Sequence, residues 1–331
     1  MFKGFSGKTF HIGSAALLAV ALGCAGCSSS QQKTNSASST TTAQLTNTKP
    51  KVLAITSVIC DVTQEIARDT VDLTCLIPAG SDPHLYEPKP NDRKAIEQAQ
   101  LILYAGYNFE PSLIKLIQAT KNQAPKVAVD EVAVPNPQKF EEDGQTETDP
   151  HVWHNAQHGI RIVETVRDNL NKISPSHAAN YSSNAEKMTR ELTQLDNWIK
   201  SQINTIPVNQ RKLVTTHDAL GYYSNAYGIP VEGALQGIST EEKPTAGRVK
   251  ELVKDIKKTG VPTIFAEMTI NPKLIEAVAK EANVKVSNRE LFADGLAEKG
   301  SAGDTYKKML IANTQTIVEG LGGKYTPFQP Q

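Results

Sequence analysis

The sequence predicts an α/β protein of two similar lobes, each built on a central parallel sheet, joined by one long rigid helix. Short apolar runs alternate with helix-like stretches of roughly 8–14 residues, which is typical of parallel strands covered by helices on both faces. This alternation occurs at 51–129 and begins again at 212–287. Between these regions, residues 177–204 carry one apolar face for about seven helical turns. We therefore expect lobes at 50–176 and 205–331, with this helix as the linker.

The first 49 residues have the features of an export signal and a tether. Lys3 and Lys8 precede a short apolar run at 12–23, as in a secretory signal peptide. Ala-Gly-Cys-Ser, ending in Cys27 and Ser28, is similar to the box of bacterial lipoproteins, in which the Cys becomes the lipidated first residue; Cys24 is the alternative, and a plain cleaved signal with incidental cysteines is another. We expect a lipoprotein signal peptide at 1–27 and a flexible Ser/Thr/Gln-rich tether at 28–49.

The first lobe is expected to contain four strands and three helices. Its strand-like runs are rich in Val, Ile and Leu, and the second ends at Pro78-Ala79-Gly80, where a turn must follow. The expected strands are 51–56, 71–77, 99–104 and 126–129, and the expected helices are a stretch ending near Asp69, 91–98 and 112–119.

The linker helix is predicted from the spacing of its apolar residues. These residues recur every three or four positions, and neither Gly nor Pro interrupts them. They are Tyr181, Ala185, Met188, Leu192, Leu195, Ile199 and Ile203. A stiff helix between two lobes limits how far the lobes can separate. The alternative is an ordinary surface helix of the second lobe.

The second lobe is expected to contain three strands and three helices. The strands are expected at 212–216, 263–266 and 285–287. One helix is expected to end at Tyr227, and the others to span 249–259 and 272–281.

The overall charge excludes one class of partner. Lys+Arg and Asp+Glu number 35 each, and the sequence pI is about 7.1, so no basic field exists to attract nucleic acid. No apolar run reaches the roughly 18 residues needed to span a bilayer. Cys60 and Cys75 remain after signal removal, and neighbouring parallel strands would bring them close. In an oxidising compartment they could form a disulfide worth roughly 3 kcal/mol, or they could remain buried free thiols.

Three of the seven histidines have similar surroundings. His84 lies in Asp-Pro-His-Leu-Tyr-Glu-Pro (82–88), His151 in Asp-Pro-His-Val-Trp (149–153), and His217 in Thr-Thr-His-Asp at a strand end. They are 67 and 66 positions apart, which excludes a zinc finger and the His-Glu-x-x-His motif of zinc proteases. In doubly wound sheets, however, residues that follow distant strands meet in one crevice.

The folded region resembles the metal-binding lipoproteins of zinc and manganese ABC importers, the cluster A-I solute-binding proteins. The matching motifs appear in the family's order: the two Asp-Pro-His motifs above, His217-Asp218-Ala219 with Gly221-Tyr222, Gly237-Ile238-Ser239-Thr240, and Glu290 to Leu296 (Glu-Leu-Phe-Ala-Asp-Gly-Leu). The resemblance implies a metal site in the cleft between the lobes. It also implies that His84 and His151 of the first lobe and His217 and Asp294 of the second lobe are the ligands.

Five further residues are candidates for the surroundings of the metal. Asp82, Asp149 and Asp218 each lie within two residues of an expected histidine ligand, so they either accept the other imidazole N–H or cap a turn. His154 follows His151 as His-x-x-His and departs from the family pattern. We expect a residue of the pocket rim or one that contacts the ligands there, with a fifth ligand as the alternative. Glu267 at the end of an expected strand either lines the pocket or makes a structural hydrogen bond.

The function that the resemblance implies is a non-enzymatic receptor. It would capture Zn²⁺ or Mn²⁺ as the transported ion, use no catalytic cofactor, and deliver the ion to a membrane permease with a separate ATPase. Three imidazole ligands favour zinc. The loop at 136–148, however, lacks the histidines often found there in zinc importers, so the choice between Zn²⁺ and Mn²⁺ stays open. We expect an extracytoplasmic, lipid-anchored monomer. The alternatives are an exported zinc metallohydrolase and a lipid-anchored surface adhesin.

Overall fold

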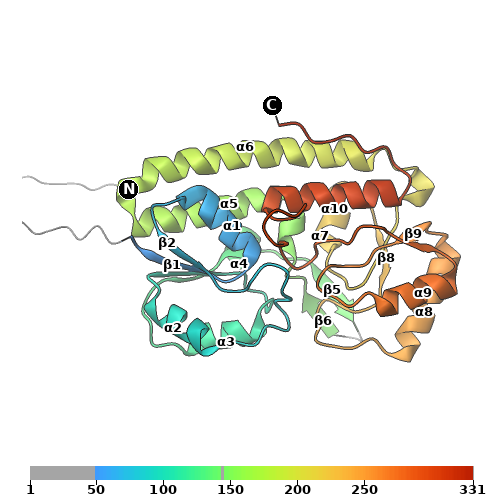
Figure 1. Cartoon of the computed structure of the whole chain (residues 1–331), viewed down its shortest axis with the longest axis horizontal. Coiled ribbons are helices and arrows are strands. Elements are labelled where there is room, and N and C mark those ends of the chain that lie inside the picture. Colours follow the sequence, from blue (N-terminus) through green and yellow to red (C-terminus); the bar gives the residue numbers. More distant parts are fainter. Residues whose placement is uncertain (1–48, 143–144, 331) are drawn as a thin grey trace, which may run out of the picture. The chain divides into compact units, whose positions relative to one another are not determined.

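The computed structural model describes residues 49–142 and 145–330, which belong to one compact unit (Figure 1). The expected signal peptide, both candidate lipidation sites Cys24 and Cys27, and the tether up to residue 48 lie outside the described residues. Among the described helices, none is both long enough and apolar enough to cross a membrane.

The first lobe is built on a four-stranded parallel sheet with the order β2-β1-β3-β4. The strands are β1 (Lys51–Ala54), β2 (Asp72–Cys75), β3 (Leu101–Tyr104) and β4 (Lys126–Ala128). Alternate residues of the inner strand β1 belong to two different hydrophobic cores. Val52 and Ala54 pack on one side of the sheet, and Leu53 packs on the other. Because both faces are covered, the strand is continuously apolar from Val52 to Ala54 rather than alternating.

Helices cover the two faces of this sheet. On one face lies α1 (Ser57–Ala67), which begins after Thr56; the Thr56 hydroxyl accepts a hydrogen bond from the backbone N–H of Ile59. On the other face lie α2 (Pro90–Gln98) and α3 (Pro111–Ala119), each with a proline at its start, where the missing N–H has no cost (Figure 1). The short helix α4 (Val129–Ala133) follows β4 directly.

The second lobe repeats this arrangement in smaller form. Strand β7 (Leu213–Thr215) pairs in parallel with β8 (Val231–Ala234), and β9 (Thr263–Ile264) pairs in parallel with β10 (Lys285–Val286). The backbone N–H of Phe265 donates to the carbonyl of Val214, so β9 lies next to β7. The resulting order β8-β7-β9-β10 matches that of the first sheet. The helices are α7 (Gly221–Tyr227), α8 (Ala246–Thr259) and α9 (Lys273–Ala282), and the prediction of two similar α/β lobes is confirmed.

A single long helix, α6 (Ala178–Ile203), runs alongside both lobes (Figure 1). All seven residues predicted to form its apolar face are buried. At its start, Asn184 donates to the carbonyl of Ile66 in the first lobe. At its end, the indole N–H of Trp198 donates to the carbonyl of Thr326 in the C-terminal segment. The helix therefore contacts both halves of the chain, and it is not a surface helix of the second lobe alone.

Two helices that the sequence analysis did not identify pack beside α6. These are α5 (Ala156–Ile173) and α10 (Tyr306–Gly320), and with α1 they share one core that extends from the first sheet to the C-terminal helix. Gly159 of α5 allows this approach, because a Cβ atom there would lie 2.2 Å from the hydroxyl oxygen of Tyr306. That hydroxyl donates to the carbonyl of Trp153. The two lobes are therefore joined by packing as well as by the chain.

The segment expected to be a loop at 136–148 is an antiparallel hairpin, which corrects that prediction. Strand β5 (Lys139–Glu142) pairs with β6 (Gln145–Thr148). Within the described residues there are also three short 3₁₀ helices: η1 (Val152–His154), η2 (Pro175–His177) and η3 (Val208–Gln210).

Cys60 and Cys75 form a disulfide in the structure. Cys60 lies in the first turn of α1, and Cys75 is the last residue of β2. Their Cα atoms are 5.6 Å apart, which is within the usual range for a bridged pair. The bridge fastens the edge strand of the first sheet to the helix that covers it.

Candidate metal centre

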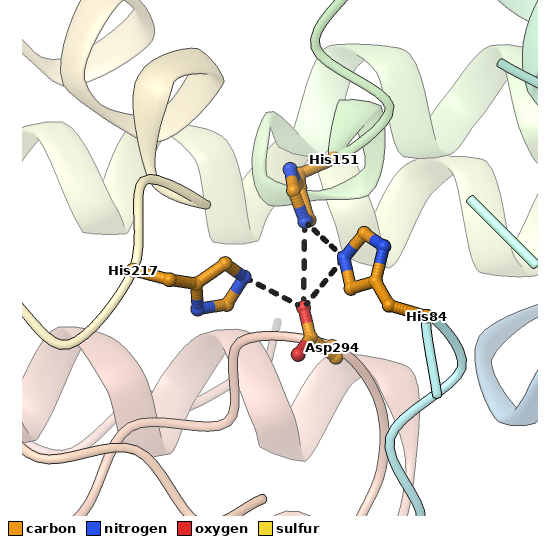
Figure 2. Close-up of side chains that lie close together, drawn as sticks. All are labelled: His84, His151, His217 and Asp294. Atoms are coloured by element: carbon orange, nitrogen blue, oxygen red, sulfur yellow. Dashed lines mark hydrogen bonds and ion pairs between the residues drawn. The ribbon is translucent and has the colours of Figure 1, made fainter. Parts of the chain in front are cut away.

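The four residues expected as ligands lie together in the structure. One side-chain atom from each of His84, His151, His217 and Asp294 lies within 4.8 Å of the corresponding atoms of the others, and all four residues are buried. Asp294 Oδ1 is 3.1 Å from His217 Nε2, 3.4 Å from His151 Nε2 and 3.9 Å from His84 Nε2. Figure 2 shows the three rings directed at the carboxylate from different sides.

Each ligand candidate comes from a separate loop. His84 lies on the loop between β2 and α2, His217 lies two residues after β7, and Asp294 follows the bridge between Glu267 and Leu291 in the second lobe. His151 comes just before η1, on the segment that leaves the β5–β6 hairpin. For three of the four, this is the crevice beyond the carboxyl ends of parallel strands.

Two carboxylates orient two of the rings. Asp149 Oδ1 accepts from the backbone N–H of His151 and lies 2.9 Å from its Nδ1. Glu267 Oε1 accepts hydrogen bonds from the backbone N–H groups of Thr216 and His217, at 2.9 and 3.0 Å. The other oxygen of Glu267, Oε2, is hydrogen-bonded to Nδ1 of His217. A ring that donates from Nδ1 to a carboxylate presents its Nε2 lone pair. In both rings that lone pair faces the centre of the cluster.

The other two expected acids have different positions. Asp82 Oδ1 accepts from the backbone N–H of His84 at 2.9 Å, and Oδ2 accepts from the hydroxyl of Thr240 at 2.7 Å. Asp82 therefore caps the turn and connects it to the second lobe. The backbone N–H of Asp218 donates to the carbonyl of Gly237, and Glu267 rather than Asp218 is the partner of the His217 ring.

His154 is fully buried, but it is outside the cluster of four. Its Nε2 lies 2.8 Å from the carbonyl oxygen of Ala293, so that nitrogen is directed at the backbone next to Asp294. Burial lowers the pKa of His154 to about 3, which keeps the ring neutral at ordinary pH.

Two buried atoms at the centre lack hydrogen-bond partners. They are His217 Nε2 and Asp294 Oδ1. Burial would raise the pKa of Asp294, but the neighbouring imidazoles, His217 first among them, hold it well below its usual value. Burial lowers the pKa of His84 to about 3, so its ring is neutral. Burial lowers the pKa of His217, but Asp294 and Glu267 outweigh it and raise this pKa well above its usual value, so a cation binds in competition with a proton on that ring. Once that proton is displaced, the centre combines an ionised carboxylate with imidazole lone pairs, which is a donor set for a cation.

A cavity of about 590 Å³ leads to this centre. Of the four ligand candidates only His84 lines it, and three glutamates, Glu147, Glu241 and Glu242, lie along its walls. Carboxylates at the mouth of a cleft raise the local concentration of cations.

Comparison with known proteins gives one consistent result. The sequence profile of the family described as zinc-uptake complex component A, periplasmic, matches residues 52–320. The metal ABC transporter substrate-binding lipoprotein SsaB of Streptococcus sanguinis is 35% identical over 282 residues, 83% of this chain and 90% of that protein. The manganese ABC transporter substrate-binding lipoprotein PsaA of Streptococcus pneumoniae serotype 4 is 34% identical over 280 residues, 82% of this chain and 89% of that protein.

Solved structures with a similar fold are also those of periplasmic metal-binding proteins. The periplasmic zinc-binding protein TroA of Treponema pallidum superposes with a TM-score of 0.78 and 33% identity, covering 82% of this chain and 99% of that one. A manganese-bound periplasmic metal-binding protein from Candidatus Liberibacter asiaticus superposes with a TM-score of 0.73 and 26% identity, covering 82% and 100%.

Proposed function

The chain belongs to the family of the periplasmic zinc-uptake complex component A, and from this premise we propose that it is the substrate-binding protein of an ABC importer. It captures Zn²⁺ or Mn²⁺ on the extracytoplasmic side of the membrane and delivers the ion to a permease, whose ATPase is a separate chain. The family consists of solute-binding proteins rather than enzymes. This assignment is favoured over an exported metallohydrolase and over a surface adhesin.

The ion is held by Nε2 of His84, His151 and His217 and by Oδ1 of Asp294. The observation that carries this assignment is that four buried ligand atoms converge there, two of which, His217 Nε2 and Asp294 Oδ1, have no hydrogen-bond partner. Zinc–nitrogen bonds of about 2.0–2.1 Å in a tetrahedron separate the ligand atoms by roughly 3.3 Å. The three distances measured from Asp294, between 3.1 and 3.9 Å, include that value. Four protein ligands fill a tetrahedron, and they leave no position for the water that a catalytic zinc needs.

The choice between zinc and manganese depends on coordination number. Three imidazoles and one monodentate carboxylate form a closed four-coordinate site, which suits zinc. A bidentate Asp294 would add a fifth bond and make the site more suitable for manganese. Oδ2 of Asp294 accepts from the hydroxyl of Thr269 at 3.4 Å, a weak contact that permits both arrangements.

The chain organisation follows from the same function. We propose a signal peptide at 1–27, lipidation at Cys27 with Cys24 as the alternative, and a tether at 28–49 that holds a monomeric receptor near its permease. The lobes are 50–176 and 205–331. The segment 177–204, which contains α6, connects them and restricts their separation to small movements that strain the ligands and release the ion.

Metal titration of the purified protein tests this function. The protein is stripped with a chelator and titrated with Zn²⁺ and Mn²⁺ in competition with an indicator. We expect one equivalent of ion per chain, bound reversibly. Binding of neither ion, or binding far below one equivalent, would reject the receptor assignment.

Glu267→Gln should weaken metal binding about 10- to 100-fold, the usual effect of removing a partner of a ligand histidine. The glutamine oxygen can still accept from backbone N–H groups, but its NH₂ group cannot accept the Nδ1 proton of His217. The ring then changes tautomer and directs an N–H at the ion. Affinity is measured by the same competition titration. Glu276→Gln, an exposed change of the same charge on α9, is the matched control and should bind as the wild type does; equal affinities of the two variants would contradict the assigned role.

A further inference from the structure

His154 connects the two halves of the metal centre. It is the last residue of η1, three positions after His151, and its Nε2 bonds to the carbonyl of Ala293, the residue before Asp294. Ligand candidates from the two lobes are therefore joined through one buried hydrogen bond. The ring itself is completely inaccessible to solvent.

The direction of this hydrogen bond follows from its partner. A carbonyl oxygen can only accept, so Nε2 of His154 carries the proton and Nδ1 carries a lone pair. That Nδ1 is buried without a hydrogen-bond partner. A buried unpaired acceptor lowers stability, and leucine would fill a similar volume without one. Leucine would, however, leave the Ala293 carbonyl without its donor, so the two effects on stability offset each other. The distinctive contribution of the side chain is its N–H at Ala293.

The Ala293 carbonyl is well placed to control Asp294. It belongs to the planar peptide unit that ends at the Asp294 Cα, so rotating this plane turns the side chain that follows. The flanking residues are fixed independently: Asn313 pairs with both the N–H and the carbonyl of Phe292, and Ser57 accepts from the N–H of Leu296. His154 supplies the hydrogen bond to the peptide plane between these two points.

We propose that His154 is a positioning residue of the metal centre. By donating to Ala293 it fixes the peptide plane that carries Asp294, and it ties the carboxylate of the second lobe to the turn that bears His151. The inference rests on the proposed function, because it assigns His154 a role in holding the transported ion.

The test compares His154→Leu and His154→Gln with the wild-type protein. Zn²⁺ and Mn²⁺ affinities are measured by competition, the Co²⁺-loaded proteins are compared by visible absorption, and metal-free melting temperatures are recorded. We expect His154→Leu to bind both ions about 10- to 100-fold more weakly, with an altered Co²⁺ spectrum and a melting temperature close to that of the wild type. His154→Gln, whose amide N–H can reach the same carbonyl, should recover most of the affinity and the wild-type spectrum.

Tyr223→Phe is the matched control. It removes a buried hydrogen bond, 2.9 Å long, between Tyr223 of α7 and Thr314 of α10, and it involves no ligand. It should lower the melting temperature and leave metal affinity unchanged.

The possible results distinguish a failure of the role proposed for His154 from a failure of the proposed function. Wild-type affinity and spectrum in His154→Leu would overturn the role of His154, and so would equal losses in the leucine and glutamine variants. If His154→Leu does not fold, His154→Asn replaces it, because its amide is too short to reach Ala293, and the same criteria apply. A wild-type protein that binds neither Zn²⁺ nor Mn²⁺ would refute the proposed function, and the inference would fall with it.

Discussion

Replacing Asp294 with asparagine should abolish tight metal binding while the protein stays folded. Asp294 is the one carboxylate in the cluster of four, and it is 1% exposed. Asparagine has nearly the same shape but no charge, so a divalent ion would be buried among neutral ligands. Removing one member of a buried charge pair costs about 3–5 kcal/mol. This corresponds to a loss of affinity of roughly two to four orders of magnitude.

Competition titration with Zn²⁺ and Mn²⁺ measures this loss, and circular dichroism of the metal-free protein checks the fold. Asp69→Asn removes the same charge from an exposed position after α1 and should bind normally. An Asp294→Asn protein whose affinity stays within about threefold of wild type would remove the central ligand from the proposed site.

The second large effect concerns stability. The Cys60→Ala/Cys75→Ala double variant should unfold with a free energy about 3 kcal/mol lower than wild type, because the disulfide closes a loop with a sequence separation of 15. For a domain of this size, that is a fall in melting temperature of roughly 6–12 °C. Metal affinity should change little, because neither cysteine is part of the metal cluster and Cys75 lies nine positions before His84.

Urea unfolding of the metal-free proteins measures the difference. Reductant should bring the wild-type midpoint to that of the double variant, and it should leave the variant unchanged. A wild-type midpoint that does not respond to reductant would show that the bridge contributes nothing to stability.

The sequence predicted those elements whose local pattern was long or strongly apolar. The stripe from Tyr181 to Ile203 identified α6 because burial against both lobes requires an apolar residue on nearly every turn. Strands β9 and β10 lie within the expected strands 263–266 and 285–287, although each is only two residues long. Strand β8, in contrast, was not predicted. Strand β8 contains Glu232 and Gly233, which interrupt an apolar run.

Helix α5 was not predicted, although its apolar residues have a helical pattern. Ile162, Val163, Val166 and Leu170 have helical spacing, and all are buried. The amphipathic pattern could have separated this helix from the loop before it. Its packing on α10, which depends on the close contact between Gly159 and Tyr306, has no local signal because the two residues are 147 positions apart (306 minus 159).

In the metal centre, too, some contacts follow from the local sequence, and others join residues that are far apart in the chain. In both Asp-Pro-His motifs, the aspartate accepts from the histidine N–H at 2.9 Å, so the shared local sequence produces a shared turn. Only Asp149 also bonds to its ring; the second oxygen of Asp82 is bonded to Thr240, 158 positions away. Glu267 is the partner of His217 across 50 positions. Which carboxylate orients which ring is thus decided by tertiary contacts that spacing does not reveal.

The unequal burial of the four ligands has a kinetic consequence. His151 and His217 are sealed inside the protein, whereas His84 retains 4% of its surface and faces the cavity. Because His84 lines the cavity and the other three residues do not, an ion that enters through it meets the His84 ring first. His84 would then be the last ligand to close on the ion and the first to detach. The order of contacts with the ligands during unloading would then be the reverse of the order during uptake.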